Sequence, residues 1–184
     1  MESRIPPSWL LNYYREAEMR SADLLQRLLR CVDDPELQIA LTRQLADEAR
    51  HIQLWTETLD ELGALPSSSR KGYRHYLQRT TGTPTSVLEM LALICVLEER
   101  VQQRYQTQLL QPGGNARIVE VLQTLAADES WHLTGVREWL TKIEKQEGKT
   151  RVGAMLNYYR PLEARAYAAL VDNLAIPEAG LDAA

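Results

Sequence analysis

The chain has no phenylalanine and is poor in several other features that define common protein classes. Only two of its 184 residues are cysteines, Cys31 and Cys95, which excludes a disulfide framework and a cysteine-rich zinc or iron–sulfur site. The formal net charge of −4 disfavours a nucleic-acid binder held by counterion release. No apolar run approaches the ~18 residues of a membrane span, and the opening MESRIPPSW lacks the apolar core of a signal peptide. We therefore expect a cytoplasmic protein that binds neither nucleic acid nor membranes.

What the chain does contain points to helices. Leu, Ala, Glu, Gln and Arg are abundant, and these residues favour the α-helix. Apolar positions recur with a period of 3.6 residues in segments separated by proline and glycine. The pattern predicts an all-α single domain over residues 1–184. Its parts are a helical hairpin at 9–63, a crossover without helical periodicity at 64–84, a second hairpin at 85–146 and a C-terminal helical segment at 150–175.

Local signals support these boundaries. Asp34 followed by Pro35 predicts a helix start, and Ser86-x-x-Glu89 predicts a capping box at another. The ~20-residue crossover is long enough to run the length of a bundle. We therefore predict a four-helix bundle with one long crossover. Pro161 predicts a kink in the fifth helical segment, or its division into two short helices.

Each of the four apolar stripes is interrupted near its middle by a glutamate. Two of these glutamates belong to a repeated Asp-Glu-x-x-His pattern, at residues 47–51 and 128–132. The glutamates of the two patterns are offset by 81 residues (129 − 48), and the lone Glu18 and Glu98 are offset by 80 (98 − 18). Two of the three histidines in the chain fall in this pattern. The sequence therefore indicates a duplicated helical hairpin, each copy with one Glu and one Glu-x-x-His.

This pattern predicts a metal site. Residues three apart lie on one helix face, so Glu-x-x-His directs a carboxylate and an imidazole to one point. Four carboxylates facing one another in a core would repel and be costly to desolvate, and two divalent cations remove both penalties. Carboxylate and imidazole donors suit iron or manganese better than magnesium, and the lack of thiolate ligands argues against a structural zinc. The predicted ligands are Glu18, Glu48, His51, Glu98, Glu129 and His132, with Glu48 and Glu129 bridging both metals.

The helical period decides between neighbouring carboxylates. In the first helix Glu16 lies on a polar stripe, whereas Glu18 aligns with apolar residues. In the third helix Glu99 aligns with glutamines, whereas Glu98 aligns with apolar residues. We therefore select Glu18 and Glu98 as ligands.

Other residues are candidates for supporting roles. Asp47 and Asp128 either accept the second imidazole N–H of a ligand histidine or are solvated acids. Tyr14 and Tyr105 either line a substrate pocket, where they donate to bound oxygen, or simply pack in the core. The crossover also contains a cluster of basic residues interleaved with two tyrosines. These basic residues either bind an anionic partner or form a solvated connection, and we favour the solvated connection. The basic residues are Arg70, Lys71, Arg74, His75 and Arg79, and the tyrosines are Tyr73 and Tyr76.

The order Glu, Glu-x-x-His, Glu, Glu-x-x-His over about residues 9–146 resembles the ferritin-like di-iron carboxylate proteins. Storage ferritins generally lack the second histidine, which is His132 here. Rubrerythrins carry a further glutamate where this chain has Val101, and many carry a cysteine-rich module that is absent here. The complete ligand set is similar to that of oxidases and oxygenases whose di-iron(II) centre activates dioxygen.

The resemblance implies an enzyme with two iron ions that reduces dioxygen or peroxide. Such an enzyme needs an external electron donor and acts as a monomer or homodimer on a small-molecule substrate, which no sequence feature identifies. Two alternatives remain open: an iron-sequestering ferritin homologue with ferroxidase activity, and a metal-free helical scaffold that binds a partner.

Overall fold

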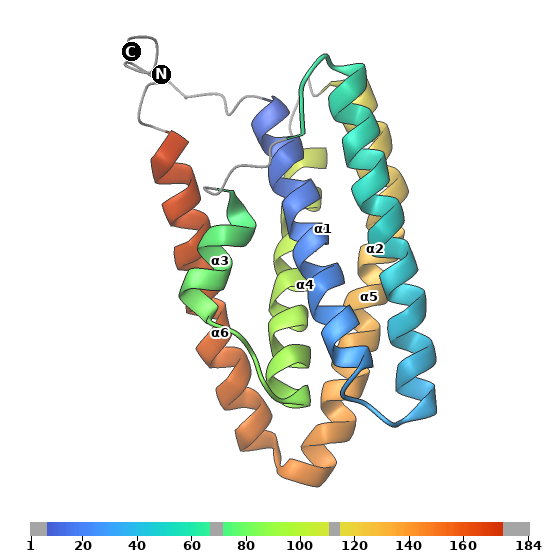
Figure 1. The fold of residues 1–184 in the computed structure, drawn as a ribbon, viewed down its shortest axis with the longest axis vertical. Coiled ribbons are helices and arrows are strands. Elements are labelled where there is room, and N and C mark those ends of the chain that lie inside the picture. Colours follow the sequence, from blue (N-terminus) through green and yellow to red (C-terminus); the bar gives the residue numbers. More distant parts are fainter. Residues whose placement is uncertain (1–6, 67–71, 111–114, 175–184) are drawn as a thin grey trace.

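A computed structural model describes residues 7–66, 72–110 and 115–174, and within these ranges the protein is an all-α bundle (Figure 1). The described residues form no β-strand. Six helices are present in these ranges: α1 (Pro7–Leu29), α2 (Pro35–Glu61), α3 (Tyr73–Thr81), α4 (Val87–Leu109), α5 (Ala116–Glu147) and α6 (Lys149–Leu174). None of these helices combines the length and apolarity that crossing a membrane requires.

Four long helices form the bundle and pair as the sequence predicts. Helix α1 packs along α2, and α4 packs along α5, with the helices of each pair running in opposite directions (Figure 1). Asp34 caps α2 by accepting a hydrogen bond from the Leu37 N–H at 2.9 Å. Ser86 and Glu89 form a reciprocal capping box at the start of α4. Both predicted helix starts are therefore confirmed.

The crossover differs from the prediction because it contains α3. Tyr73, Leu77 and Thr81 lie four residues apart and are buried, and the helix packs against α1 and α6. A helix of nine residues is marginal in isolation, so packing against its neighbours decides its formation. Gly72 precedes it because a Cβ at this position would clash with the Glu16 carboxylate.

The basic cluster of the crossover is therefore not simply a solvated connection. Arg70 and Lys71 lie outside the described residues. Arg74 forms an ion pair with Asp23 of α1, with 3.3 Å between Nη1 and Oδ2. Tyr73, which the sequence placed among these charges, is only 1% exposed.

Helix α6 continues through Pro161, so its predicted division into two short helices is wrong. Proline removes one backbone hydrogen bond from a helix interior, but α6 packs against α3, α4 and α5. This packing offsets the loss because α6 contributes a buried face, made of Val152, Tyr159, Glu163, Ala166 and Leu170. The bundle thus acquires a fifth long helix beside α4 (Figure 1).

Candidate metal centre

The six predicted ligand residues meet in the middle of the bundle, and each is at most 2% exposed. They form two groups in which potential ligand atoms lie within 4.8 Å of one another. We call these groups the first triad (Glu18, His51, Glu129) and the second triad (Glu48, Glu98, His132). Each triad takes one Glu and one His from one hairpin and a second Glu from the other hairpin. The two hairpins are therefore interleaved at the centre.

Both histidines direct Nδ1 toward the carboxylates. The distance from His51 Nδ1 to Glu129 Oε1 is 3.0 Å, and that from His132 Nδ1 to Glu48 Oε1 is 3.5 Å. The other oxygen of Glu48 lies 3.9 Å from His51 Nδ1. The Glu48 carboxylate therefore reaches the imidazoles of both triads, the position that a bridging ligand needs.

The centre holds buried polar atoms that have no hydrogen-bond partner among the described residues. They are Glu48 Oε2, both carboxylate oxygens of Glu129, and Nδ1 of His51 and His132. Buried polar groups in folded proteins almost always have a partner, so five orphaned atoms at one point require an explanation. All five can offer a lone pair to a cation. The donor set therefore fits divalent metal ions.

The two aspartates of the repeated pattern bind the opposite histidines. Asp128 Oδ2 lies 3.3 Å from His51 Nε2, and Asp47 Oδ2 lies 3.3 Å from His132 Nε2. Arg50 contacts both aspartates, at 3.3 Å from Asp47 and 2.5 Å from Asp128. A neutral imidazole that donates from Nε2 presents the Nδ1 lone pair. The crossed pairs therefore direct both Nδ1 lone pairs into the centre.

Gln44 is a further residue of the centre that the sequence interpretation missed. Its side-chain amide donates to Glu98 Oε1 at 2.9 Å and lies 3.4 Å from Glu48 Oε1. The available signal was a glutamine on the buried stripe of α2, four residues before Glu48. The equivalent position of the second copy is Leu125. The surroundings of the two triads are therefore not symmetric.

The two candidate tyrosines have different surroundings. Tyr105 donates to Glu18 Oε1 at 2.6 Å and accepts a hydrogen bond from Trp55 Nε1 at 3.0 Å. Tyr14 packs against the rings of Trp55 and Tyr105 and borders a cavity of about 370 Å³ between α1, α4 and α6. Only Tyr105 therefore contacts a predicted ligand directly.

The neighbouring glutamates that the helical period rejected lie away from the centre. Glu16 accepts a hydrogen bond from the Arg74 backbone N–H at 3.3 Å, at the start of α3. Glu99 forms ion pairs with Arg137 at 3.0 Å and with Arg160 at 3.1 Å.

Burial and mutual repulsion shift the pKa values of the centre. Burial, followed by nearby carboxylates, raises the pKa of Glu48 and of Glu98 well above the ordinary range. The same causes raise the pKa of Glu129 to about 7. Burial lowers the pKa of His51, but the nearby carboxylates of Glu129 and Glu18 outweigh it and raise this pKa to about 10. The metal-free centre therefore retains protons that a bound metal must displace.

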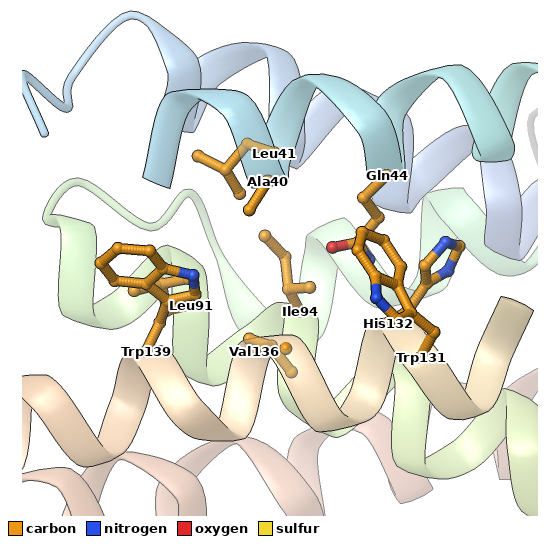
Figure 2. A pocket seen from close by; sticks show the side chains of 10 residues that line it. Ala40, Leu41, Gln44, Leu91, Ile94, Trp131, His132, Val136 and Trp139 are labelled. Carbon is orange, nitrogen blue, oxygen red and sulfur yellow. The ribbon is translucent and has the colours of Figure 1, made fainter. Parts of the chain in front are cut away.

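A small pocket borders this centre at Gln44 and His132. Its volume is about 30 Å³, and it lies between α2, α4 and α5. Gln44 and His132 stand at one end and Trp139 and Leu91 at the other (Figure 2). Apolar side chains form most of the wall, and Trp131 beside His132 is 45% exposed. The space suits one small molecule.

No protein-family model matches the chain, and no curated protein matches it in sequence.

Proposed function

We propose that this protein is a ferritin-like di-iron oxidoreductase that reduces dioxygen or peroxide. The observation that carries the proposal is the pair of interleaved triads, in which five buried carboxylate and imidazole atoms converge without a hydrogen-bond partner among the described residues. An apolar core tolerates facing carboxylates only when bound protons or cations neutralise their charge. Two divalent ions match the four glutamate charges.

Each residue of the proposed centre has a distinct role. Glu18 and Glu98 are terminal ligands held by Tyr105 and Gln44 respectively. Glu48 and Glu129 would be shared by the two metals, and His51 and His132 would each supply one imidazole nitrogen. When bound, the iron ions would supply the electrons for reduction of the oxidant. The buried surroundings exclude bulk water, since all six ligand residues are at most 2% exposed.

Anaerobic loading with iron(II) tests this function. We expect two iron ions per chain, and exposure to air should produce the near-ultraviolet absorption of an oxo-bridged ferric pair. Protein that binds no iron after chelator-free purification would be a scaffold. A large hollow assembly that accumulates many irons per chain would identify a storage protein. Either result would contradict the proposal.

Gly135 offers a test of the pocket as the route for dioxygen. It lines the pocket, and a Cβ added at this position meets no atom within 4 Å. The Cβ of a Gly135→Leu side chain therefore meets no obstacle, and the side chain should narrow the pocket. We expect unchanged iron binding and oxidation by dioxygen about tenfold slower, which corresponds to a barrier about 1.4 kcal/mol higher.

Stopped-flow mixing of the iron(II)-loaded protein with dissolved dioxygen measures this rate. Gly153→Leu is the matched control, because this α6 glycine also has nothing within 4 Å of an added Cβ and does not line the pocket. Equal rates in the two variants would show that dioxygen enters elsewhere.

A further inference from the structure

The cavity that Tyr14 borders is lined by basic residues and by no acidic residue of the described chain. It has a volume of about 370 Å³ and lies between α1, α4 and α6, and we call it the α4 cavity. Arg100 and Arg104 of α4 line it. Pockets that bind small organic molecules have volumes of roughly 300 to 1,000 Å³. The α4 cavity is therefore large enough to hold such a molecule.

The two arginines differ in their partners. Arg100 Nε forms an ion pair with Glu163 Oε2 at 2.7 Å, and Arg100 Nη1 donates to Gln103 Oε1 at 3.0 Å. Arg104 makes no hydrogen bond or ion pair with any described residue, and its Nε atom is buried without a partner. An arginine side chain keeps its charge in proteins. The cavity wall therefore carries one positive charge that no carboxylate of the described residues neutralises.

Two tyrosine rings hold the Arg104 guanidinium in place. Its central carbon lies 3.2 Å from the centroid of the Tyr167 ring and 5.0 Å from that of the Tyr13 ring. Such contacts use the flat face of the guanidinium and leave the N–H donors at its edge. These donors form a fork that suits the two oxygens of a carboxylate. The side chain is therefore held at the cavity wall while its terminal donors remain unused.

The charge and the lining of the α4 cavity indicate which anion it suits. One unpaired guanidinium matches a single negative charge, whereas a phosphate group carries about −1.5 to −2 at pH 7. An inorganic ion of a few atoms would leave most of the volume unfilled, since one water molecule occupies about 30 Å³. Leu10 and Tyr14 form an apolar part of the wall on α1. These features favour an anion with one charge and an apolar body.

We propose that the α4 cavity binds a small organic carboxylate that has an apolar body. The carboxylate pairs with the edge of Arg104, and the apolar body lies against Leu10 and Tyr14. None of the six ligand residues of the metal centre lines this cavity. Tyr14 packs against Tyr105, which in turn donates to Glu18, so the site is near the centre but separate from it. The inference therefore does not rest on the proposed function.

Calorimetric titration of the metal-free protein at low salt tests the site. The probes are cinnamate and octanoate, two carboxylates with apolar bodies, and cinnamyl alcohol, the neutral counterpart of cinnamate. We expect at least one of the carboxylates to bind with one molecule per chain. Cinnamyl alcohol should bind at least about tenfold more weakly than cinnamate, because it cannot form a charged pair with the guanidinium. Inorganic phosphate should not displace the bound carboxylate.

An Arg104→Gln variant tests the residue that recognises the charge. It should weaken carboxylate binding at least about tenfold, the effect of losing hydrogen bonds between charged groups, and should leave the affinity for cinnamyl alcohol unchanged. Arg43→Gln is the matched control because it removes the same charge from an exposed position on α2 that does not line the cavity. This control should bind the carboxylate as the parent does.

An Ala164→Trp variant tests the cavity without altering any charge. Ala164 lines the cavity and is exposed on α6, so a larger side chain there can narrow the space without entering the core. We expect weaker carboxylate binding in this variant and unchanged binding in Ala154→Trp, an exposed alanine of α6 that does not line the cavity. Circular dichroism verifies that each variant is folded.

Three results would each overturn the proposal. They are the failure of both carboxylates to bind, equal affinity for cinnamate and cinnamyl alcohol, and parent-like affinity in both Arg104→Gln and Ala164→Trp. Displacement of the carboxylate by phosphate would show that the site selects an inorganic anion and would overturn the assigned ligand class. All of these measurements use metal-free protein, so none of their outcomes bears on the proposed function, which iron loading decides.

Discussion

A Glu48→Gln variant is expected to lose the thermal stabilisation that iron(II) confers on the parent protein. Glu48 is fully buried, and its carboxylate reaches the imidazoles of both triads. Glutamine keeps the shape but removes the charge that holds two cations. At a free iron(II) concentration 100 times the dissociation constant, binding at one site stabilises the parent by about 2.7 kcal/mol. For a chain of this length that is a rise in the melting temperature of about 5 to 10 °C.

The same substitution should not destabilise the metal-free protein. Burial, followed by neighbouring carboxylates, raises the pKa of Glu48, so removal of the acid relieves a penalty. Anaerobic thermal unfolding with and without iron(II) measures both effects. Glu99→Gln is the control, because Glu99 pairs with Arg137 and Arg160 away from the centre and should retain the iron effect. A Glu48→Gln protein that iron(II) still stabilises fully would exclude this carboxylate as a ligand.

The metal-free and iron-loaded proteins should respond to pH in opposite directions. The pKa of Glu129 is raised to about 7, so the folded state keeps a proton that the unfolded chain loses above about 4.5. The pKa of His51 is raised from 6.5 to about 10, so between these pH values the folded state again keeps a proton that the unfolded chain loses. Both groups stabilise the folded state at low pH, and this stability is lost as pH rises through the folded-state values. As the pH rises from about 4.5 to about 10, the free energy of unfolding of the metal-free protein should fall by on the order of a few kcal/mol.

Metal binding has the opposite sign because the ligands must release their protons. The stabilisation by iron(II) should therefore grow as pH rises. Anaerobic melting curves from about pH 5 to about pH 9, with and without iron(II), cover most of the Glu129 titration and the lower part of the His51 titration. Parallel pH profiles for the two forms would mean that iron binds outside this centre. A Glu129→Gln variant should flatten the metal-free profile below about pH 7, which identifies the group responsible.

The sequence contained enough information to find the six central residues. Helical periodicity is strong in long amphipathic helices, and it correctly separated Glu18 from Glu16 and Glu98 from Glu99 as the inward residues. The repeated Asp-Glu-x-x-His pattern added specificity, since both copies fall on buried stripes. Residue type and spacing are therefore sufficient to locate the residues of a site that is built on regular helices.

Features that depend on tertiary contacts were not predictable in this way. Helix α3 is too short to show sustained periodicity and forms against α1 and α6. Gln44 carries no motif, and its role follows from the distance to Glu98 across the bundle. The crossed contacts of Asp47 and Asp128 depend on how α2 and α5 face each other. Helix α6 is continuous because packing outweighs the local effect of Pro161.

The interleaving of the triads has a consequence for the origin of the molecule. Neither hairpin holds a complete triad, because each borrows a glutamate from the other, and each aspartate orients the histidine across from it. A hairpin that existed alone, before the duplication that the repeated pattern indicates, could have completed such a triad only with a second copy of itself. The two halves now differ beside the triads, where Gln44 of the first hairpin corresponds to Leu125 of the second.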